Sequence, residues 1–436
     1  MSGIEIAMAS ILAMLVLIYA GMHVAVALAL ISFVSIGMLR DFTIAGNMLS
    51  LAFKDAISDY LFGVVPLFVL MGLLVSAAGI GRDTFSVANQ IFRRITGGLG
   101  VATVAANAVF AAITGISIAS AAIFTKVAVP EMLRHGYSPR FAVGVVAGSS
   151  VLGMLIPPSL LFIIYGVLTE QSVGALFLAG VIPGILLTLL YSAAIIVIGH
   201  LNPSFLGDVK YSIDDETKMP WSEIASKILP IVILVALVLG GIYGGFFTPT
   251  EAGAAGAAGA LIIALVKRRL TWRSFWQVMV ETGHTTSSIC ILIIGASVYS
   301  RMLALSGFPS MLSSAVVESN FGITVVLLLY ILVLLLLGTI LDSASIMLLT
   351  LPVILPVLIA ANVDLIWVGV LTVLGVEIGL LTPPFGIAVY VIKSTLGPNS
   401  DISLGDIFRG AAPFALMMAV ILALVFVFPK LATAFI

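Results

Sequence analysis

The sequence predicts an all-α, polytopic membrane protein, and three observations support this class. Hydrophobic residues make up 61% of the 436 residues and charged residues only 9%, whereas a soluble protein carries about 25% charged residues. The apolar runs are continuous and close to the ~20 residues that a spanning helix needs, without the alternation of a membrane β-strand. Two of the runs contain a Pro-Pro pair, Pro157-Pro158 and Pro383-Pro384.

The apolar segments follow one another with short polar turns between them, and we expect about ten transmembrane helices. The long polar stretch predicts a connector, 206–227, between a first repeat, 1–205, and a second repeat, 228–436. Two amphipathic pieces, 42–58 and 270–283, are typical of helices that lie in the membrane interface. The apolar segments are 4–20, 22–39, 61–80, 97–133, 141–168, 174–199, 228–245, 250–266, 284–304, 319–362, 365–392 and 410–429, of which 97–133 and 319–362 predict hairpins and 141–168 and 365–392 predict proline-broken helices.

Charge and cysteine content exclude several classes of protein. Nineteen Lys and Arg against twenty Asp and Glu leave no basic surface for nucleic acid. The single cysteine, Cys290, rules out an intramolecular disulfide. The N-terminus lacks the basic region of a cleavable signal and continues into further spans, so we expect no signal peptide.

Each hairpin segment is long enough for two helices and has a hydroxyl-rich middle that is almost free of charge. Arg94 and Arg134 flank the first, which predicts that both of its ends are cytoplasmic. Glu318 and Asp364 flank the second, which predicts that it opens to the outside. The middles, AITGISIASAA and GTILDSASIM, can persist at membrane depth only against protein or water, so we expect re-entrant hairpins. The alternative is two ordinary helix pairs whose turns reach the far surface.

The order of elements repeats along the chain. Each half contains two spans, an interfacial piece, a span, a hairpin, a proline-broken span and a closing span. The spacing from Gly115 to Pro157 nearly equals that from Gly338 to Pro383. Because the hairpins open to opposite sides, the halves form an inverted-topology repeat, the architecture of secondary transporters that hold substrate and ions near mid-membrane.

The Pro-Pro pairs predict helix breaks that expose backbone carbonyls. Proline has no N–H, so the carbonyls four residues earlier lose their helical donors. Free carbonyls at mid-membrane suit a bare cation, and the helix that starts after each break directs its positive end at an anion. The alternative is a simple kink whose carbonyls bond a Ser or Thr side chain or water. The freed carbonyls are those of Gly153, Met154, Gly379 and Leu380.

Ionisable residues inside apolar segments are energetically costly and are candidates for function. Asp342, in the second tip, could hold a cation, orient the tip or face water, and we favour a role at the site. Glu377 could support the site or be a partnered structural carboxylate. Arg301 could bind a substrate carboxylate or extend to the interface. Lys126 and Glu131 are expected to belong to the cytoplasmic arm of the first hairpin.

With these residues in view, the chain resembles the large membrane (M) subunit of tripartite ATP-independent periplasmic (TRAP) transporters, within the ion transporter superfamily. The family's Ser-Gly-Ser-Ser tip is Thr114-Gly115-Ile116-Ser117 here, with isoleucine in place of one hydroxyl. His23 stands where many relatives have proline. The segments that carry the resemblance are VPLFVLMGLLVSAAGI (65–80), VPEMLRHGYSP (129–139), LGMLIPPSLLFIIYG (152–166), LFLAGVIPGILL (176–187), YGGFFTPTEAGAAGA (243–257) and VEIGLLTPPFGIAVYV (376–391).

The resemblance implies an elevator mechanism driven by a sodium gradient in the bacterial or archaeal inner membrane. A periplasmic binding protein would deliver a carboxylate or sialic acid, and a small membrane subunit, expected as a separate polypeptide, would brace the scaffold. The first implied Na+ site comprises Gly115, Ser117, Ser120, Gly153, Met154, Ile156 and Pro157. The second comprises Gly338, Thr339, Asp342, Ser343, Gly379, Leu380 and Thr382. The candidate substrate-binding residues are Ser120, Ser159, Arg301, Asp342, Ser345 and Pro384.

Three other functions compete with a tripartite transporter subunit. A stand-alone ion-coupled carboxylate carrier could have the same inverted-repeat design without a binding protein. An intramembrane enzyme is disfavoured, because the four histidines (23, 135, 200 and 284) are widely scattered and no nucleophile and base have convincing spacing. A passive channel would not need polar tips that bind a coupling ion.

Overall fold

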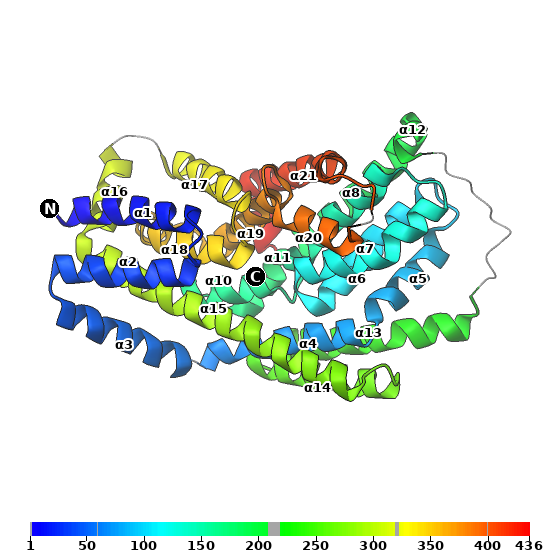
Figure 1. The fold of residues 1–436 in the computed structure, drawn as a ribbon, viewed down its shortest axis with the longest axis horizontal. Helices are drawn as coiled ribbons and strands as arrows, with labels where there is room; N and C mark the ends of the chain where they lie inside the picture. Colours follow the sequence, from blue (N-terminus) through cyan, green and yellow to red (C-terminus); the bar gives the residue numbers. More distant parts are fainter. Residues whose placement is uncertain (1, 59, 208–218, 319–321, 399) are drawn as a thin grey trace.

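A computed structural model describes residues 2–58, 60–207, 219–318, 322–398 and 400–436. Within these ranges the regular structure is helical, apart from one isolated bridge between Tyr137 and Gly207. The predicted all-α class is therefore confirmed. The molecule is elongated, with the N-terminal helices at one end of its long axis and α5 and α12 at the other (Figure 1).

One group of helices, which we call the wall, joins the N-terminal helices to those that follow residue 220. Helix α15 packs along α2 and α4, α14 packs against α4 and α13, and α1 and α3 flank α2. The wall consists of α1 (Gly3–Tyr19), α2 (Val24–Leu39), α3 (Phe42–Ser58), η1 (Tyr60–Gly63), α4 (Val64–Ala77), α13 (Trp221–Tyr243), α14 (Pro249–Val266), α15 (Trp272–Ser306) and α16 (Phe308–Glu318), and α5 (Ile80–Phe92) continues from α4.

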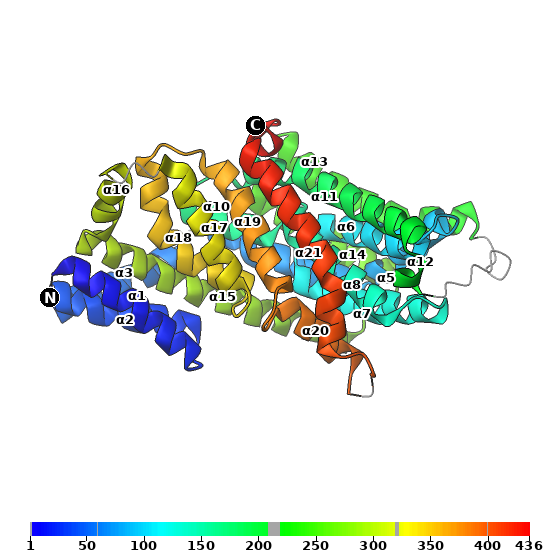
Figure 2. The same ribbon diagram turned by 90° about the horizontal axis from the view of Figure 1, so that it is seen from above.

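A second group, the hairpin bundle, holds both hairpins and both broken helices. Helix α21 packs against α8, α19 and α11, so elements from the two halves of the chain interlock (Figure 2). The first half contributes α6 (Gly98–Thr114), α7 (Ser117–Arg134), α8 (Pro139–Ser150), α9 (Leu152–Leu155), α10 (Leu160–Thr169), α11 (Val173–Leu201) and α12 (Pro203–Leu206). The second half contributes α17 (Gly322–Gly338), α18 (Ser343–Ala360), α19 (Leu365–Leu381), α20 (Ile387–Leu396), α21 (Leu404–Val427) and α22 (Lys430–Thr433).

The two predicted hairpins are α6–α7 and α17–α18, the second described from Gly322 onward. Each first arm has 17 residues, which at 1.5 Å per residue rise about 26 Å, less than the ~30 Å of a hydrocarbon core. The hairpins run toward each other from opposite ends of the molecule and their tips lie near its middle (Figures 1 and 2). The short first arms fit re-entrant hairpins rather than two complete spans each, while the second arm α18, with 18 residues, is long enough to span on its own.

Both Pro-Pro pairs interrupt a helix, as predicted. The first lies between α9 and α10 and the second between α19 and α20, and both peptide bonds are cis. Seven described helices or helix pairs are long and apolar enough to cross a membrane, and eight if the bent pair α4–α5 is counted as one span. Shorter apolar helices, including both first arms of the hairpins, complete the set.

Some element boundaries differ from the prediction. The piece 270–283 is not a separate interfacial helix but the start of α15, a single helix of 35 residues. It contains no proline that would break the helix, and no neighbouring atom lies within 4 Å of a Cβ added at Gly283. The predicted span 61–80 ends in a bend of 61° between α4 and α5. Half of the connector 206–227, residues 208–218, lies outside the described residues, and α13 begins within it at Trp221.

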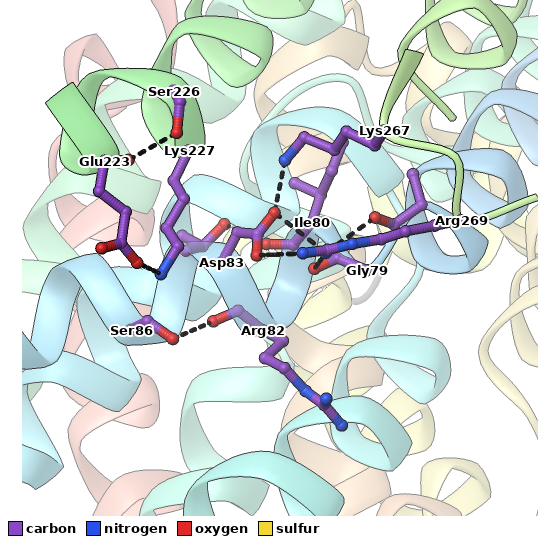
Figure 3. Close-up of polar contacts among 12 residues, drawn as sticks. Gly79, Ile80, Arg82, Asp83, Ser86, Glu223, Ser226, Lys227, Lys267 and Arg269 are labelled. Carbon is purple, nitrogen blue, oxygen red and sulfur yellow. Dashed lines mark hydrogen bonds and ion pairs between the residues drawn. The ribbon is translucent and has the colours of Figure 1, made fainter. Parts of the chain in front are cut away.

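Charged residues that follow α14 fix the bend between α4 and α5. Arg269 donates to the carbonyls of Ala78 and Gly79 at 3.2 Å and to both oxygens of Asp83 at 3.1–3.2 Å (Figure 3). Lys267 also pairs with Asp83, whose side chain is only 4% exposed. Arg269 thus satisfies carbonyls at the end of α4 and, with Lys267, neutralises the carboxylate in the first turn of α5.

Removing the Asp83 charge should destabilise the protein. Asp83→Asn keeps the shape but leaves Lys267 and Arg269 without their counter-ion, and loss of one partner of a buried pair costs about 3 kcal/mol. The matched control is Glu223→Gln, which removes an exposed pair with Lys227 worth at most about 1 kcal/mol. Chemical unfolding in detergent measures both free energies, and equal losses would contradict the proposed anchoring of the bend.

Candidate functional site

The first hairpin tip packs backbone to backbone against the first broken helix. Gly115 has a φ of +63°, and a Cβ added there would lie 2.4 Å from the carbonyl oxygen of Pro158. The amide of Leu160 donates to the Gly115 carbonyl at 3.2 Å. A Cβ added to Gly153 would lie 3.0 Å from the amide nitrogen of Ser117. Position 115 therefore requires glycine, for its conformation and for its lack of a side chain.

The second tip contacts the second broken helix in the same way. A Cβ on Gly338 would lie 2.6 Å from the Cα of Gly379, and a Cβ on Gly379 would lie 2.5 Å from the Cα of Gly338. The amide of Gly386, just after the Pro-Pro pair, donates to the Thr339 carbonyl at 3.1 Å. In both halves, then, a tip carbonyl accepts a hydrogen bond from the backbone that follows the break. The structure brings each predicted tip to its predicted break.

Two of the four carbonyls predicted to be free have protein partners. The Ser159 hydroxyl donates to the Met154 carbonyl and also accepts from the amide of Phe162 at the start of α10. The amide of Thr382 donates to the Gly379 carbonyl at 2.9 Å. The prediction is therefore wrong for Met154 and Gly379, because a local hydroxyl and a tight turn replace the lost helical donors. Each oxygen keeps a second lone pair for a further ligand.

Other predicted ion-site residues lie at the breaks and tips but use their polar groups locally. Ile156, which with Pro157 forms the first break, donates its amide to the Leu152 carbonyl at 2.9 Å. The hydroxyls of Thr339 and Thr382 donate to the backbone carbonyls of Leu336 and Ile378 respectively, each at 2.8 Å. Leu380 lies in the last turn of α19 and is buried. The protons of these hydroxyls are used in local hydrogen bonds, and their oxygen lone pairs remain available to a cation.

Ser120 is held in a buried network that the sequence did not predict. Its hydroxyl donates to Asn107 Oδ1 at 2.7 Å, and Asn107 Nδ2 donates to Ser149 Oγ at 2.6 Å. Asn107 and Ser149 are 42 residues apart, as are Tyr330 and Thr372, whose hydroxyls lie 3.2 Å apart. Both bonds join the first arm of a hairpin to the helix that precedes a break. Nothing in the sequence marks Asn107 as a partner of Ser120 and Ser149 before the fold brings them together.

Asp342 orients the second tip and also lines a cavity beside it. Its carboxylate accepts hydrogen bonds from the amide of Ser345, at 3.1 Å, and from the Ser345 hydroxyl, so it caps the N-terminus of α18. The first tip has Ile116 at the corresponding helix start and no side-chain cap. Only the second tip therefore adds a carboxylate to its carbonyl and hydroxyl oxygens.

A cavity of about 830 Å³ lies between both hairpin tips and the wall. The first tip lines it with Ile116, Ile118, Ala119 and Ala122, and the second tip lines it with residues 340–345. The wall contributes the turn between α1 and α2 and one face of α15. The cavity is mostly apolar with a few polar groups, as in small-molecule sites generally.

The wall supplies polar groups that the sequence analysis did not single out. They are His23, Glu281, His284, Thr285 and Ser288. The cluster His-Thr-Thr-Ser-Ser at 284–288, inside an apolar segment, was a usable signal. Among the described residues that line the cavity there is no lysine or arginine, so an anion would meet imidazoles and hydroxyls there, together with the carboxylates of Glu281 and Asp342.

The structure brings only some of the candidate substrate residues together. Asp342 and Ser345 line the cavity. Ser120 and Ser159 are buried in the networks described for them, and Pro384 is exposed at the second break. Arg301 does not line the cavity, and it pairs instead with Asp55 of α3 at 2.7 Å. Sequence could not reveal this pair, because its members are 246 residues apart.

Comparison with known proteins identifies related transport permeases. The family model described as "Tripartite ATP-independent periplasmic transporter, DctM component" matches residues 11–431. The sialic acid TRAP transporter large permease protein SiaM of Vibrio cholerae is 33% identical over 425 residues, which are 97% of this chain and 96% of the relative. The C4-dicarboxylate TRAP transporter large permease protein DctM of Pseudomonas aeruginosa is 33% identical over 388 residues, 88% of each chain.

Two solved transporters share the fold at low sequence identity. MtrF of Neisseria gonorrhoeae has a TM-score of 0.62 at 14% identity, covering 89% of this chain and 84% of that protein. The YdaH transporter of Alcanivorax borkumensis has a TM-score of 0.60 at 14% identity, covering 87% and 88%. These likenesses establish the fold alone.

The contact between Gly338 and Gly379 can be tested by adding one methyl group. Gly379→Ala would place a Cβ 2.5 Å from the Cα of Gly338, and overpacking of this kind costs about 1–3 kcal/mol. Gly240→Ala in α13 is the control, because nothing lies within 4 Å of an added Cβ there. Thermal unfolding should show a lower midpoint for the first variant and an equal or higher midpoint for the second, and two indistinguishable midpoints would contradict the close packing.

Proposed function

Since the chain belongs to the tripartite ATP-independent periplasmic (TRAP) transporter family as a DctM component, we propose that it takes up a small organic anion by secondary active transport driven by a sodium gradient. The family consists of transport permeases, so the prediction that the chain is not an enzyme is confirmed. The chain is likewise a multi-pass membrane protein, and we place it in the bacterial inner membrane. Relatives named for sialic acid and for C4-dicarboxylates support a carboxylate substrate.

The cavity between the tips and the wall is the observation that carries this proposal. It is large enough for a small metabolite and is bounded by Asp342 and Ser345 on one side and by His284 on the other. A substrate carboxylate in it would meet the hydroxyls of the tip and of α15 and the imidazoles of His23 and His284, since Asp342 already caps the positive end of α18. Because both tips border the cavity, an ion that orders a tip would also shape the substrate site.

We assign the coupling ions to the two contacts between tip and break. Each contact gathers backbone carbonyls and hydroxyls from a hairpin tip and an interrupted helix, the arrangement that holds sodium in transporters with broken helices. The first site has neutral oxygens around Gly115, Ser117 and the break at Gly153–Pro157. The second adds the Asp342 carboxylate to Gly338, Ser343 and the break at Gly379–Thr382. Neutral oxygens with at most one carboxylate suit a monovalent cation.

The division into a wall and a hairpin bundle supports an elevator mechanism. In this proposal the bundle carries the substrate and both ions past the wall, while α5 and α15, which pack against the first and second hairpins respectively, connect the two groups. A periplasmic binding protein would deliver the substrate, and a small membrane subunit would hold the wall in place. The alternative is a stand-alone carrier, and uptake by proteoliposomes without any binding protein would favour that alternative.

The charge of Asp342 should set the sodium affinity of the second site. Asparagine caps helices as well as aspartate does, so Asp342→Asn keeps the bond from the Ser345 amide and removes the charge, while the second oxygen, which accepts from the Ser345 hydroxyl, becomes an NH2 group that can donate to that hydroxyl. We expect the sodium concentration for half-maximal uptake to rise about tenfold, which corresponds to ~1.4 kcal/mol of lost ion binding. Asp364→Asn is the matched control, because Asp364 caps α19 through the amides of Ile366 and Trp367 and lies outside both proposed sites.

Uptake is measured in proteoliposomes that contain the chain, its small subunit and a loaded binding protein, with sodium varied against choline. Ser120→Ala should also weaken uptake, because it leaves the buried Asn107 Oδ1 without its donor beside the first site. If neither Asp342→Asn nor Ser120→Ala alters the sodium dependence, the two site assignments are wrong. If the wild-type protein takes up substrate equally well in choline, sodium coupling itself is wrong.

A further inference from the structure

Glu377 is a fully buried carboxylate near the end of α19. The helix is buried from Val368 to Leu381, and the exposed fraction of Glu377 is 0%. Among the described residues, none of the ion pairs includes Glu377. An ionisable group so placed is costly in an apolar interior unless hydrogen bonds or helix ends offset its desolvation. The hydrogen bonds and helix ends around Glu377 therefore indicate its role.

The first residues of two hairpin helices converge on this carboxyl group. Ser343, the first residue of α18, donates to Glu377 Oε1 at 2.9 Å. The hydroxyl of Ser117, the first residue of α7, lies close to the same carboxyl group, without a hydrogen bond of normal geometry. Each serine directly follows a hairpin tip, and each begins a helix of 18 residues whose N-terminal end favours negative charge. One side chain thus lies between equivalent positions of the two repeats.

The contact on the side of the first tip is incomplete. Both Ser117 Oγ and Glu377 Oε2 are buried and have no hydrogen-bond partner in the described chain. The neighbouring hydroxyl of Tyr191 does not fill this role, because it donates to the Phe414 carbonyl at 3.2 Å. Buried polar groups normally have hydrogen-bond partners. A small movement of the first tip would let the Ser117 hydroxyl donate to Glu377 Oε2 and would satisfy both groups.

We propose that Glu377 is a positioning residue that couples the two hairpin tips, and through them the two sodium sites of the proposed function, on which this inference rests. The bond from Ser343 fixes the second tip, and closure of the first tip onto its ion brings the Ser117 hydroxyl to Oε2. With both bonds made, one side chain of α19 holds both tips. An ion that orders one tip then lowers the conformational cost of ordering the other, so sodium binding is cooperative.

The test uses sodium binding to the purified complex with its small subunit, which requires no knowledge of the substrate. Binding of NaCl is followed at one temperature by isothermal titration calorimetry, and the unfolding temperature is measured in parallel, with choline chloride keeping ionic strength constant. The wild-type protein should show a Hill coefficient clearly above 1. Glu377→Gln keeps the volume but leaves one acceptor oxygen for two hydroxyls, so we expect a Hill coefficient of about 1 and a roughly tenfold higher half-saturating NaCl concentration.

Two further variants separate coupling from general destabilisation. Thr372→Val, also buried on α19, should lower the unfolding temperature at every NaCl concentration and leave the Hill coefficient unchanged. Ser117→Ala should lower the Hill coefficient in the wild-type background but not in Glu377→Gln. Glu377→Asp, whose shorter side chain cannot reach both serines, carries the test if Glu377→Gln does not fold. A wild-type Hill coefficient in Glu377→Gln, or in Glu377→Asp if that variant carries the test, would overturn the coupling. Equal stabilisation of the wild-type protein by NaCl and choline chloride would instead overturn the proposed function.

Discussion

The need to satisfy backbone polar groups where helices end inside an apolar interior determines this structure. Four helix ends meet at each tip and break, and water cannot reach them freely in a membrane. The protein solves the problem twice in the same way, by a hydrogen bond from the amide after the break to a carbonyl of the opposing tip. Glycines at 115, 153, 338 and 379 permit that approach, so the sites follow from the backbone rather than from a rich set of side chains.

Features that depend on local chemistry could be predicted from the sequence. Proline pairs mark the breaks and small residues mark the tips, because a missing donor and a missing Cβ act at their own positions in the chain. The bundle, the hairpins and the pairing of each tip with its break were accessible for that reason. The length of α15 was not, since the absence of a break over 35 residues is a weaker signal than the presence of one.

Features that depend on distant partners could not be predicted. The assignment of Arg301 to the substrate failed to anticipate Asp55, which only folding brings within 2.7 Å. The same reasoning treated Met154 as a free carbonyl, although Ser159 lay five residues away and could reach it. Asn107 was overlooked because a single amide in an apolar arm has no chemical signature until Ser120 and Ser149 are placed beside it.

The ion pairs of Asp83 with Lys267 and Arg269 have a consequence for how the protein is made. Helices α4 and α5 leave the ribosome early, but the cations that hold their bend belong to residues 267–269. Until α14 has been synthesised and inserted, Asp83 has no counter-ion and the end of α4 has no cap from Arg269. The bend on which the first hairpin packs therefore has its full set of contacts only in a chain that extends past residue 269. A truncated first half would lack the contacts that set the angle between α4 and α5.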